Sequence, residues 1–65
     1  MYSVVENRGH DVNYIVFIGD YEDCNTWMAL NTKEHPNNPD IRISIDDDNV
    51  NGNGEPFTYT IEVED

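Results

Sequence analysis

The feature that most constrains this fold is a regular alternation of apolar and polar residues within a strongly acidic chain. The 65 residues include 14 Asp and Glu against 3 Lys and Arg, for a formal net charge of −11. An acidic chain without apolar periodicity would stay disordered, because it has too little apolar surface to bury. Here the periodicity persists, which predicts a folded domain with its charges at the surface.

Four segments have patterns typical of β-strands. Residues 2–6 and 12–18 flank a segment of turn-forming residues, 7–11, and this arrangement predicts a hairpin. Residues 12–18 have apolar side chains at both odd and even positions, and so on both faces of the strand. We therefore expect this strand to be covered on both faces or centrally placed. Residues 41–45 and 57–63 alternate apolar and polar side chains, as half-buried strands do.

A helix is expected between the two pairs of strands, over residues 21–32. Asp20, followed three residues later by Asp23, resembles a capping box with Asp in place of the usual Glu or Gln. Apolar side chains then recur near the spacing of one helical face. These side chains are Tyr21, Cys24, Trp27, Met28 and Leu30.

The two prolines of residues 35–40 predict that the helix is followed by a loop, since proline removes a backbone donor and restricts its predecessor. The expected fold is therefore a single α+β domain over residues 1–65, with the element order ββαββ. Each apolar face must find cover, so we expect an antiparallel sheet of about four strands with one helix packed on one face.

Composition excludes several classes of function. Three basic side chains cannot neutralise several phosphates, so neither direct nucleic-acid binding nor attachment to a membrane is expected. The chain has a lone cysteine, Cys24, on the expected core face of the helix, and no apolar run near the roughly 20 residues that span a bilayer. We expect a soluble, cytoplasmic protein. His10 and His35 lack zinc-ligand spacing, and no catalytic motif is present, so we expect no enzyme activity and no cofactor.

One local pattern is similar to the first half of an EF-hand calcium loop. Asp47, Asn49 and Asn51 alternate before Gly52, as oxygen ligands and a turn glycine do in such loops. Thr58 occupies the twelfth position, where the motif requires a bidentate Glu. An acidic turn is therefore the favoured interpretation, and a weak metal site formed by Asp47, Asn49, Asn51 and Glu55 is the alternative.

The acidic residues form three runs along the chain that together are candidates for binding a partner. Preorganised carboxylates on a shaped surface attract the Lys and Arg side chains that normally bind phosphates. The candidate partner-binding residues are Glu22, Asp23, Asp46, Asp47, Asp48, Glu62 and Glu64, with Asp65 next to the last of them.

In size, acidity and α+β pattern the chain resembles the small inhibitors and DNA-mimic proteins that phages encode against host nucleases, restriction systems, CRISPR effectors or polymerases. The resemblance carries over no individual residue. It implies a non-enzymatic acidic protein, monomeric or homodimeric, that occupies the basic nucleic-acid-binding groove of a host protein in the host cytoplasm by mimicking phosphate charge.

Two other hypotheses stay open at this stage. The chain is alternatively a small structural or self-assembly module that pairs through an uncovered sheet face or an edge strand, with acidity serving solubility. The second alternative is a calcium-responsive module that uses the loop at residues 47–55.

Overall fold

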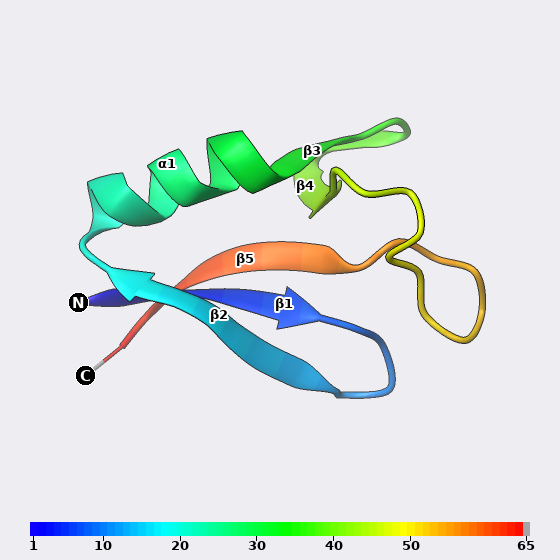
Figure 1. Cartoon of the computed structure of the whole chain (residues 1–65), viewed down its shortest axis with the longest axis horizontal. Helices are drawn as coiled ribbons and strands as arrows, with labels where there is room; N and C mark the ends of the chain where they lie inside the picture. Colours follow the sequence, from blue (N-terminus) through cyan, green and yellow to red (C-terminus); the bar gives the residue numbers. More distant parts are fainter. Residues whose placement is uncertain (65) are drawn as a thin grey trace.

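The chain folds into a five-stranded antiparallel sheet with one helix on one face (Figure 1). The computed structural model describes residues 1–64. The elements are β1 (Tyr2–Asn7), β2 (Asn13–Gly19), α1 (Tyr21–Asn31), β3 (Thr32–His35), β4 (Asn38–Ser44) and β5 (Thr58–Val63). The strand order is β2-β1-β5-β4-β3, which places the first strand between the second and the last. The α+β class is confirmed. The expectation of about four strands in the order ββαββ was wrong, because the sheet has an additional strand.

The additional strand arises where a loop was expected. β3 follows α1 directly and pairs with β4 around a turn at Pro36 and Asn37, so the expectation of a loop over residues 35–40 was wrong. Pro39 lies within β4, at a position that pairs with neither β3 nor β5. Its missing N–H therefore costs no ladder hydrogen bond, and the strand tolerates the proline.

The hairpin formed by β1 and β2 is confirmed, and its turn uses left-handed backbone conformations. Gly9, His10 and Asp11 have φ values of 90°, 51° and 61°. The Asn7 side chain accepts a 2.8 Å hydrogen bond from the Gly9 N–H, which closes the start of the turn. Glycine and short polar residues adopt this region at the lowest cost, so the local sequence explains the turn.

A β-bulge in β2 changes which side chains share a face. Ile15 pairs with Val5 and Ile18 pairs with Ser3, so Val16 is an extra residue in the ladder. Val5 and Ser3 are two residues apart on β1 and therefore point to the same face. Ile15 and Ile18, although three residues apart, both lie on the face opposite α1, which we call the outer face.

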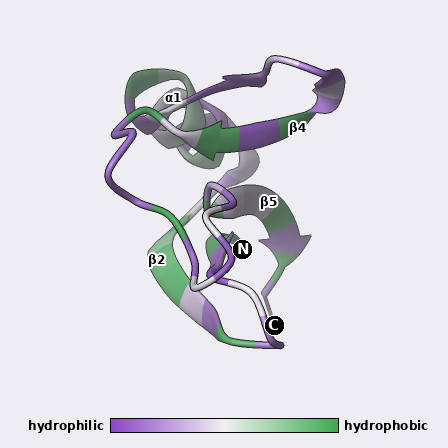
Figure 2. Cartoon of the chain, turned by 90° about the vertical axis from the view of Figure 1, so that its right-hand side faces the viewer, coloured by the Kyte–Doolittle hydropathy of each residue, from purple (hydrophilic) through white to green (hydrophobic). Residues whose placement is uncertain are grey.

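β2 lies at an edge of the sheet, not at its centre or under cover on both faces as its apolar pattern had suggested. Tyr14, Ile15 and Ile18 are 49%, 52% and 50% exposed. The only helix within residues 1–64 covers one face, and β5 occupies the central position, with β1 between it and β2. Figure 2 shows the hydrophobic band along β2 in green.

The helix begins where its capping residues predict. Asp20 caps α1, and its Oδ1 accepts a 2.9 Å hydrogen bond from the Asp23 N–H. Cys24 and Met28 are buried against the sheet. Tyr21 and Leu30 are 54% and 72% exposed, so their expected places on the core face were wrong.

The core lies between α1 and the sheet and is small. Its buried residues are Val4, Cys24, Met28 and Tyr59. Partly buried side chains surround it: Tyr2, Val16, Phe17, Trp27, Phe57 and Ile61. Within residues 1–64 no helix is long and apolar enough to cross a membrane.

Candidate functional site

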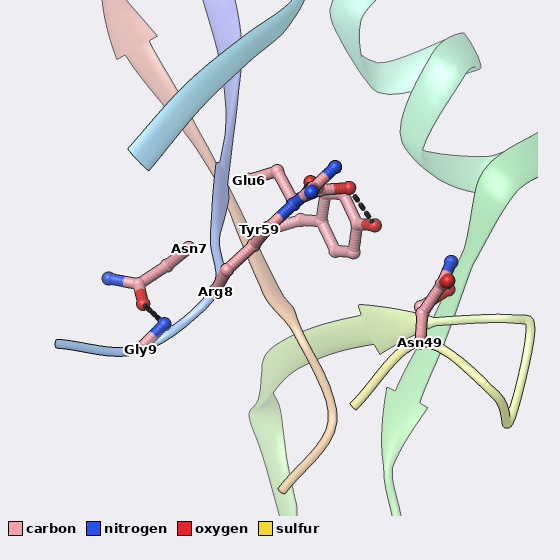
Figure 3. A network of polar contacts seen from close by, with 7 residues as sticks. Glu6, Asn7, Arg8, Gly9, Asn49 and Tyr59 are labelled. Carbon is pink, nitrogen blue, oxygen red and sulfur yellow. Dashed lines mark hydrogen bonds and ion pairs between the residues drawn. The ribbon is translucent and has the colours of Figure 1, made fainter. Parts of the chain in front are cut away.

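A buried carboxylate joins the central strand, β5, to its neighbour β1. Glu6, on β1, is 6% exposed and lies directly across from Tyr59 on β5. The Tyr59 hydroxyl donates a 2.6 Å hydrogen bond to Glu6 Oε2, and Arg8 Nε donates to Glu6 Oε1 (Figure 3). Both carboxylate oxygens therefore have partners, as buried charged groups require.

Arg8 lies over two aromatic rings while it bonds to Glu6. Its guanidinium carbon is 4.5 Å from the centroid of the Tyr14 ring and 5.1 Å from that of Phe57. Both distances are within the range of cation–π attraction. The hydrogen bond to Glu6 raises the pKa of Arg8 above its ordinary value. This cation is therefore held against the protein's own side chains.

Burial raises the pKa of the Tyr59 hydroxyl to about 12, and its hydrogen bond to Glu6 acts in the same direction. Ser44 and Arg8 lower it by smaller amounts. The hydroxyl is thus protonated at neutral pH and donates to Glu6. Sequence inspection missed this network because a strand Glu is usually solvent-facing, but Glu6 has the same parity as Tyr2 and Val4, and that signal would have placed it inside.

The other two basic side chains also have internal partners. Lys33 Nζ lies 2.9 Å from Asp47 Oδ1, and the hydrogen bond holds the pKa of that carboxyl below its usual range. Arg42 donates from Nε to Thr32 Oγ1 at 3.0 Å and from Nη2 to the Thr32 carbonyl at 2.9 Å. Across residues 1–64, the salt-bridged carboxylates are Glu6 and Asp47 alone, which leaves the other acidic groups without a neutralising cation.

Four of the seven candidate partner-binding residues lie at one end of the molecule. Glu22 and Asp23 are exposed in the first turn of α1, while Glu62 and Glu64 lie at the end of β5. Tyr2 pairs with both Gly19 and Val63, so the chain leading into α1 and the end of β5 flank the same point of β1 (Figure 1).

These four carboxylates nevertheless lie on both sides of the sheet. Ser3, on the outer face, donates a 3.1 Å hydrogen bond to Glu64 Oε2. Glu22 and Asp23 belong to the helix on the opposite face. Asp65 lies outside the described residues. The end of the molecule is therefore acidic on two faces, and it presents no single flat patch.

Asp46, Asp47 and Asp48 lie at the other end of α1. Asp47 pairs with Lys33, which follows the last helical residue by two positions. The 11 residues of α1 span about 16 Å at roughly 1.5 Å per residue. The structure therefore places exposed carboxylates at both ends of the helix, and we refer to Glu22, Asp23, Asp46, Asp47 and Asp48 as the helix-end acids.

The loop that resembles half of a calcium site uses its candidate ligands to form turns. Asn51 Oδ1 accepts hydrogen bonds from the Asn53 and Glu55 N–H groups at 2.9 and 3.1 Å. Asn49 Nδ2 donates to Ser44 Oγ at 3.0 Å. In the described part of the chain, no three His, Cys, Asp or Glu side chains are grouped so as to hold a metal ion. The polar groups of this loop thus organise the loop itself.

The remaining reactive side chains take structural positions. Cys24 is fully buried in the core. His10 lies exposed in the β1–β2 turn, and His35 Nδ1 accepts a 3.0 Å hydrogen bond from the Asn37 N–H in the β3–β4 turn. Each of these three side chains is in a different part of the fold.

A shallow groove runs between α1 and β2. It is lined by Phe17, Asp23, Thr26, Trp27, Leu30 and Asn31. Phe17 and Trp27 stack with ring centroids 6.5 Å apart and form its apolar floor. The groove lies beside the exposed edge of the sheet, so apolar surface and unpaired backbone occur together there.

Comparison of this chain with protein-family models, with curated proteins and with solved structures finds no match.

Proposed function

We propose that this chain is a non-enzymatic acidic binding protein, of the kind encoded by phages as inhibitors, that occupies the basic nucleic-acid-binding groove of another protein. The observation that carries the proposal is the density of negative charge along the long axis of the chain. A net charge of −11 along a long axis of 32 Å corresponds to about one charge per 3 Å. One strand of DNA carries about one per 3.4 Å.

The engagement of the basic residues supports this proposal. Arg8, Lys33 and Arg42 all have internal partners, so they oppose the field of the exposed carboxylates mainly at their own positions. A basic groove that meets such a surface gains ion pairs and loses bound counterions, as it does on binding nucleic acid. Exposed ion pairs are screened by salt, so affinity should fall steeply as salt rises.

The positions of the helix-end acids indicate the spacing of basic side chains that a partner would need. They bracket α1, an exposed ridge on one face of the sheet, with a separation of about 16 Å. A groove with Lys or Arg side chains at two sites that far apart would contact both groups at once. The partner class is a nuclease, restriction, CRISPR or transcription protein of the host cytoplasm, and the inhibitor is active as a monomer or a homodimer.

The first test is a capture experiment with a bacterial lysate at about 0.1 M salt, where the Debye length is about 10 Å, and again at about 0.5 M. We expect a nucleic-acid-binding protein to be captured at the lower salt, released at the higher salt and displaced by added DNA. The captured protein, once purified, should lose affinity for labelled DNA when this chain is added in a fluorescence anisotropy titration.

Charge-reversal variants locate the surface. Asp46→Lys, Asp47→Lys and Asp48→Lys together should weaken capture at least tenfold without loss of the folded circular dichroism spectrum. A control that makes the same change in net charge combines Asp11→Lys, Glu34→Lys and Asp40→Lys. Equal weakening by both variants would show that only net charge matters, and capture that neither salt nor DNA reverses would contradict phosphate mimicry.

A further inference from the structure

The two edges of the sheet differ in their capacity to pair with another strand. β3, at one edge, has four residues and includes Lys33 and Glu34. β2, at the other edge, has seven residues and no charged side chain. Natural edge strands are usually shortened or charged, because a long neutral edge presents unpaired N–H and C=O groups to other chains. β2 is neither short nor charged, although it contains a bulge, which is another feature that limits pairing at sheet edges.

The bulge gives β2 a self-complementary arrangement of apolar side chains. Ile15 and Ile18 both lie on the outer face and are about half exposed, with Val5 beside Ile15. In an antiparallel pairing of two copies centred between Val16 and Phe17, Ile15 of each copy lies across from Ile18 of the other. Cross-strand pairs of β-branched residues stabilise sheets. The four isoleucines would form one cluster across the two-fold axis.

A cation and two carboxylates lie at opposite ends of β2, although the cation is already paired with Glu6 of its own copy. Arg8 lies over the ring of Tyr14, at the beginning of the strand. Asp20 and Asp23 follow the end of the strand, and Asp23 Cβ is 3.3 Å from the position that a Cβ on Gly19 would take. Antiparallel pairing brings the Arg8–Glu6 ion pair of one copy to the Asp23 end of the other, twice over, by symmetry.

From this combination we infer that the chain pairs with a second copy of itself through β2, which forms a two-fold symmetric sheet of ten strands. A copy of this chain supplies the neutral strand and the isoleucines in the order that the site requires, as an isologous interface must. The inference does not depend on the proposed function. Asp23, a helix-end acid, lies beside the end of β2, but the charge-reversal variant that tests the proposed function changes only Asp46, Asp47 and Asp48.

Salt separates this association from the proposed partner binding. Two copies of net charge −11 repel one another over long range, and salt screens that repulsion. Self-association should therefore strengthen between 0.05 and 0.5 M salt (about 14 Å falling to about 4 Å in Debye length), whereas binding to a basic groove should weaken. Failure of one prediction leaves the other unaffected.

The test is sedimentation equilibrium of the purified chain over about a hundredfold range of concentration at low and high salt. We expect a monomer–dimer equilibrium whose dissociation constant falls with salt. Ile15→Lys and Ile18→Lys together should raise that constant at least tenfold, although they reduce the net negative charge. Thermal melts monitor whether the variants remain folded.

The matched control is Ile45→Lys combined with Val63→Lys, because both side chains are exposed, at 59% and 72%, and neither is on β2. This variant should dimerise at least as well as the native chain. A strictly monomeric native chain at all concentrations and salts would overturn the inference. So would a dimer that the β2 variant leaves intact, or one that both variants weaken equally.

Discussion

The hydroxyl of Tyr59 donates a 2.6 Å hydrogen bond to the carboxylate of Glu6 from the directly opposed position on the neighbouring strand. The two residues are 53 positions apart in sequence, so the bond ties the first strand of the chain to the last. Because both side chains are buried, the pair stabilises one register of β1 against β5.

Replacing Tyr59 by Phe should destabilise the fold while leaving its shape intact. The change removes the donor and leaves Glu6 Oε2 buried without that partner, and hydrogen bonds to charged groups contribute about 1.5–3 kcal/mol. Urea unfolding should show a loss of that size. Tyr14→Phe is the matched control, since its half-exposed ring has no such bond, and a similar loss in both variants would contradict the role of the pair.

Stability should decline in alkaline solution because of the same hydroxyl. The pKa of Tyr59 is raised to about 12 in the folded chain, above its ordinary value near 10, which the unfolded chain regains. The raised pKa means that the contribution to stability is complete below pH 10 and is lost as pH rises towards 12. Urea unfolding at intervals between pH 8 and 11.5 should show this decline, and Tyr59→Phe should flatten it. Ultraviolet titration in which all four tyrosines ionise near pH 10 would contradict the assignment.

Removal of the helix cap should weaken α1. Asp20→Ala deletes the acceptor of the Asp23 N–H, and N-cap substitutions of this kind cost about 0.5–2 kcal/mol. Asp20→Asn should keep most of the stability, because the amide oxygen also accepts this bond. Thermal melts of the two variants test the expectation, and equal losses would indicate that charge at the helix terminus, and not the cap bond, is what matters.

The glycines of the two long connections should respond differently to alanine. Gly9 has a φ of 90°, and an added Cβ would lie 3.0 Å from Asn51 Nδ2, so Gly9→Ala should destabilise the chain by about 1–2 kcal/mol. Gly52 has no positive φ and no atom within 4 Å of an added Cβ. Gly52→Ala should therefore be neutral or slightly stabilising in chemical denaturation. A larger loss at Gly52 than at Gly9 would contradict the described turn.

Calcium should not stabilise the chain specifically. Asn51 Oδ1 already accepts two backbone hydrogen bonds, and Asp47 is paired with Lys33, so two of the candidate ligands are engaged. A ligand that binds only the folded state raises the melting temperature. We expect millimolar calcium and magnesium at equal ionic strength to have the same small effect. A larger shift with calcium, abolished by Asp47→Asn, would support the calcium-responsive alternative.

Local patterns predicted the elements whose determinants lie close together in sequence. The turn at Gly9 and the cap at Asp20 depend on backbone preferences and on side chains two or three residues away, and both are confirmed. The β3–β4 hairpin was missed because two prolines normally mark a loop. Pro39 is tolerated since it has no ladder partner, which depends on pairing with distant segments.

The candidate partner-binding residues could be identified by type but not by arrangement. Composition showed an excess of carboxylates, whereas the ion pair between Lys33 and Asp47 and the grouping of acids at the two ends of α1 required coordinates. The buried position of Glu6 could be predicted only because Glu6 and Val4 are two positions apart on one strand and therefore share a face. The charge of Glu6 argued against that prediction.

By itself, the sequence determined an acidic α+β domain with a capped helix, a first hairpin and strands of known parity, because these depend on short-range periodicity and local hydrogen bonding. Only the tertiary structure decided that β5 lies at the centre with β1 beside it, that β2 lies at a neutral edge and that Glu6 is buried opposite Tyr59. Periodicity reports which side chains share a face. It does not report which distant strand lies alongside, and that choice arises from packing and hydrogen bonding across the whole chain.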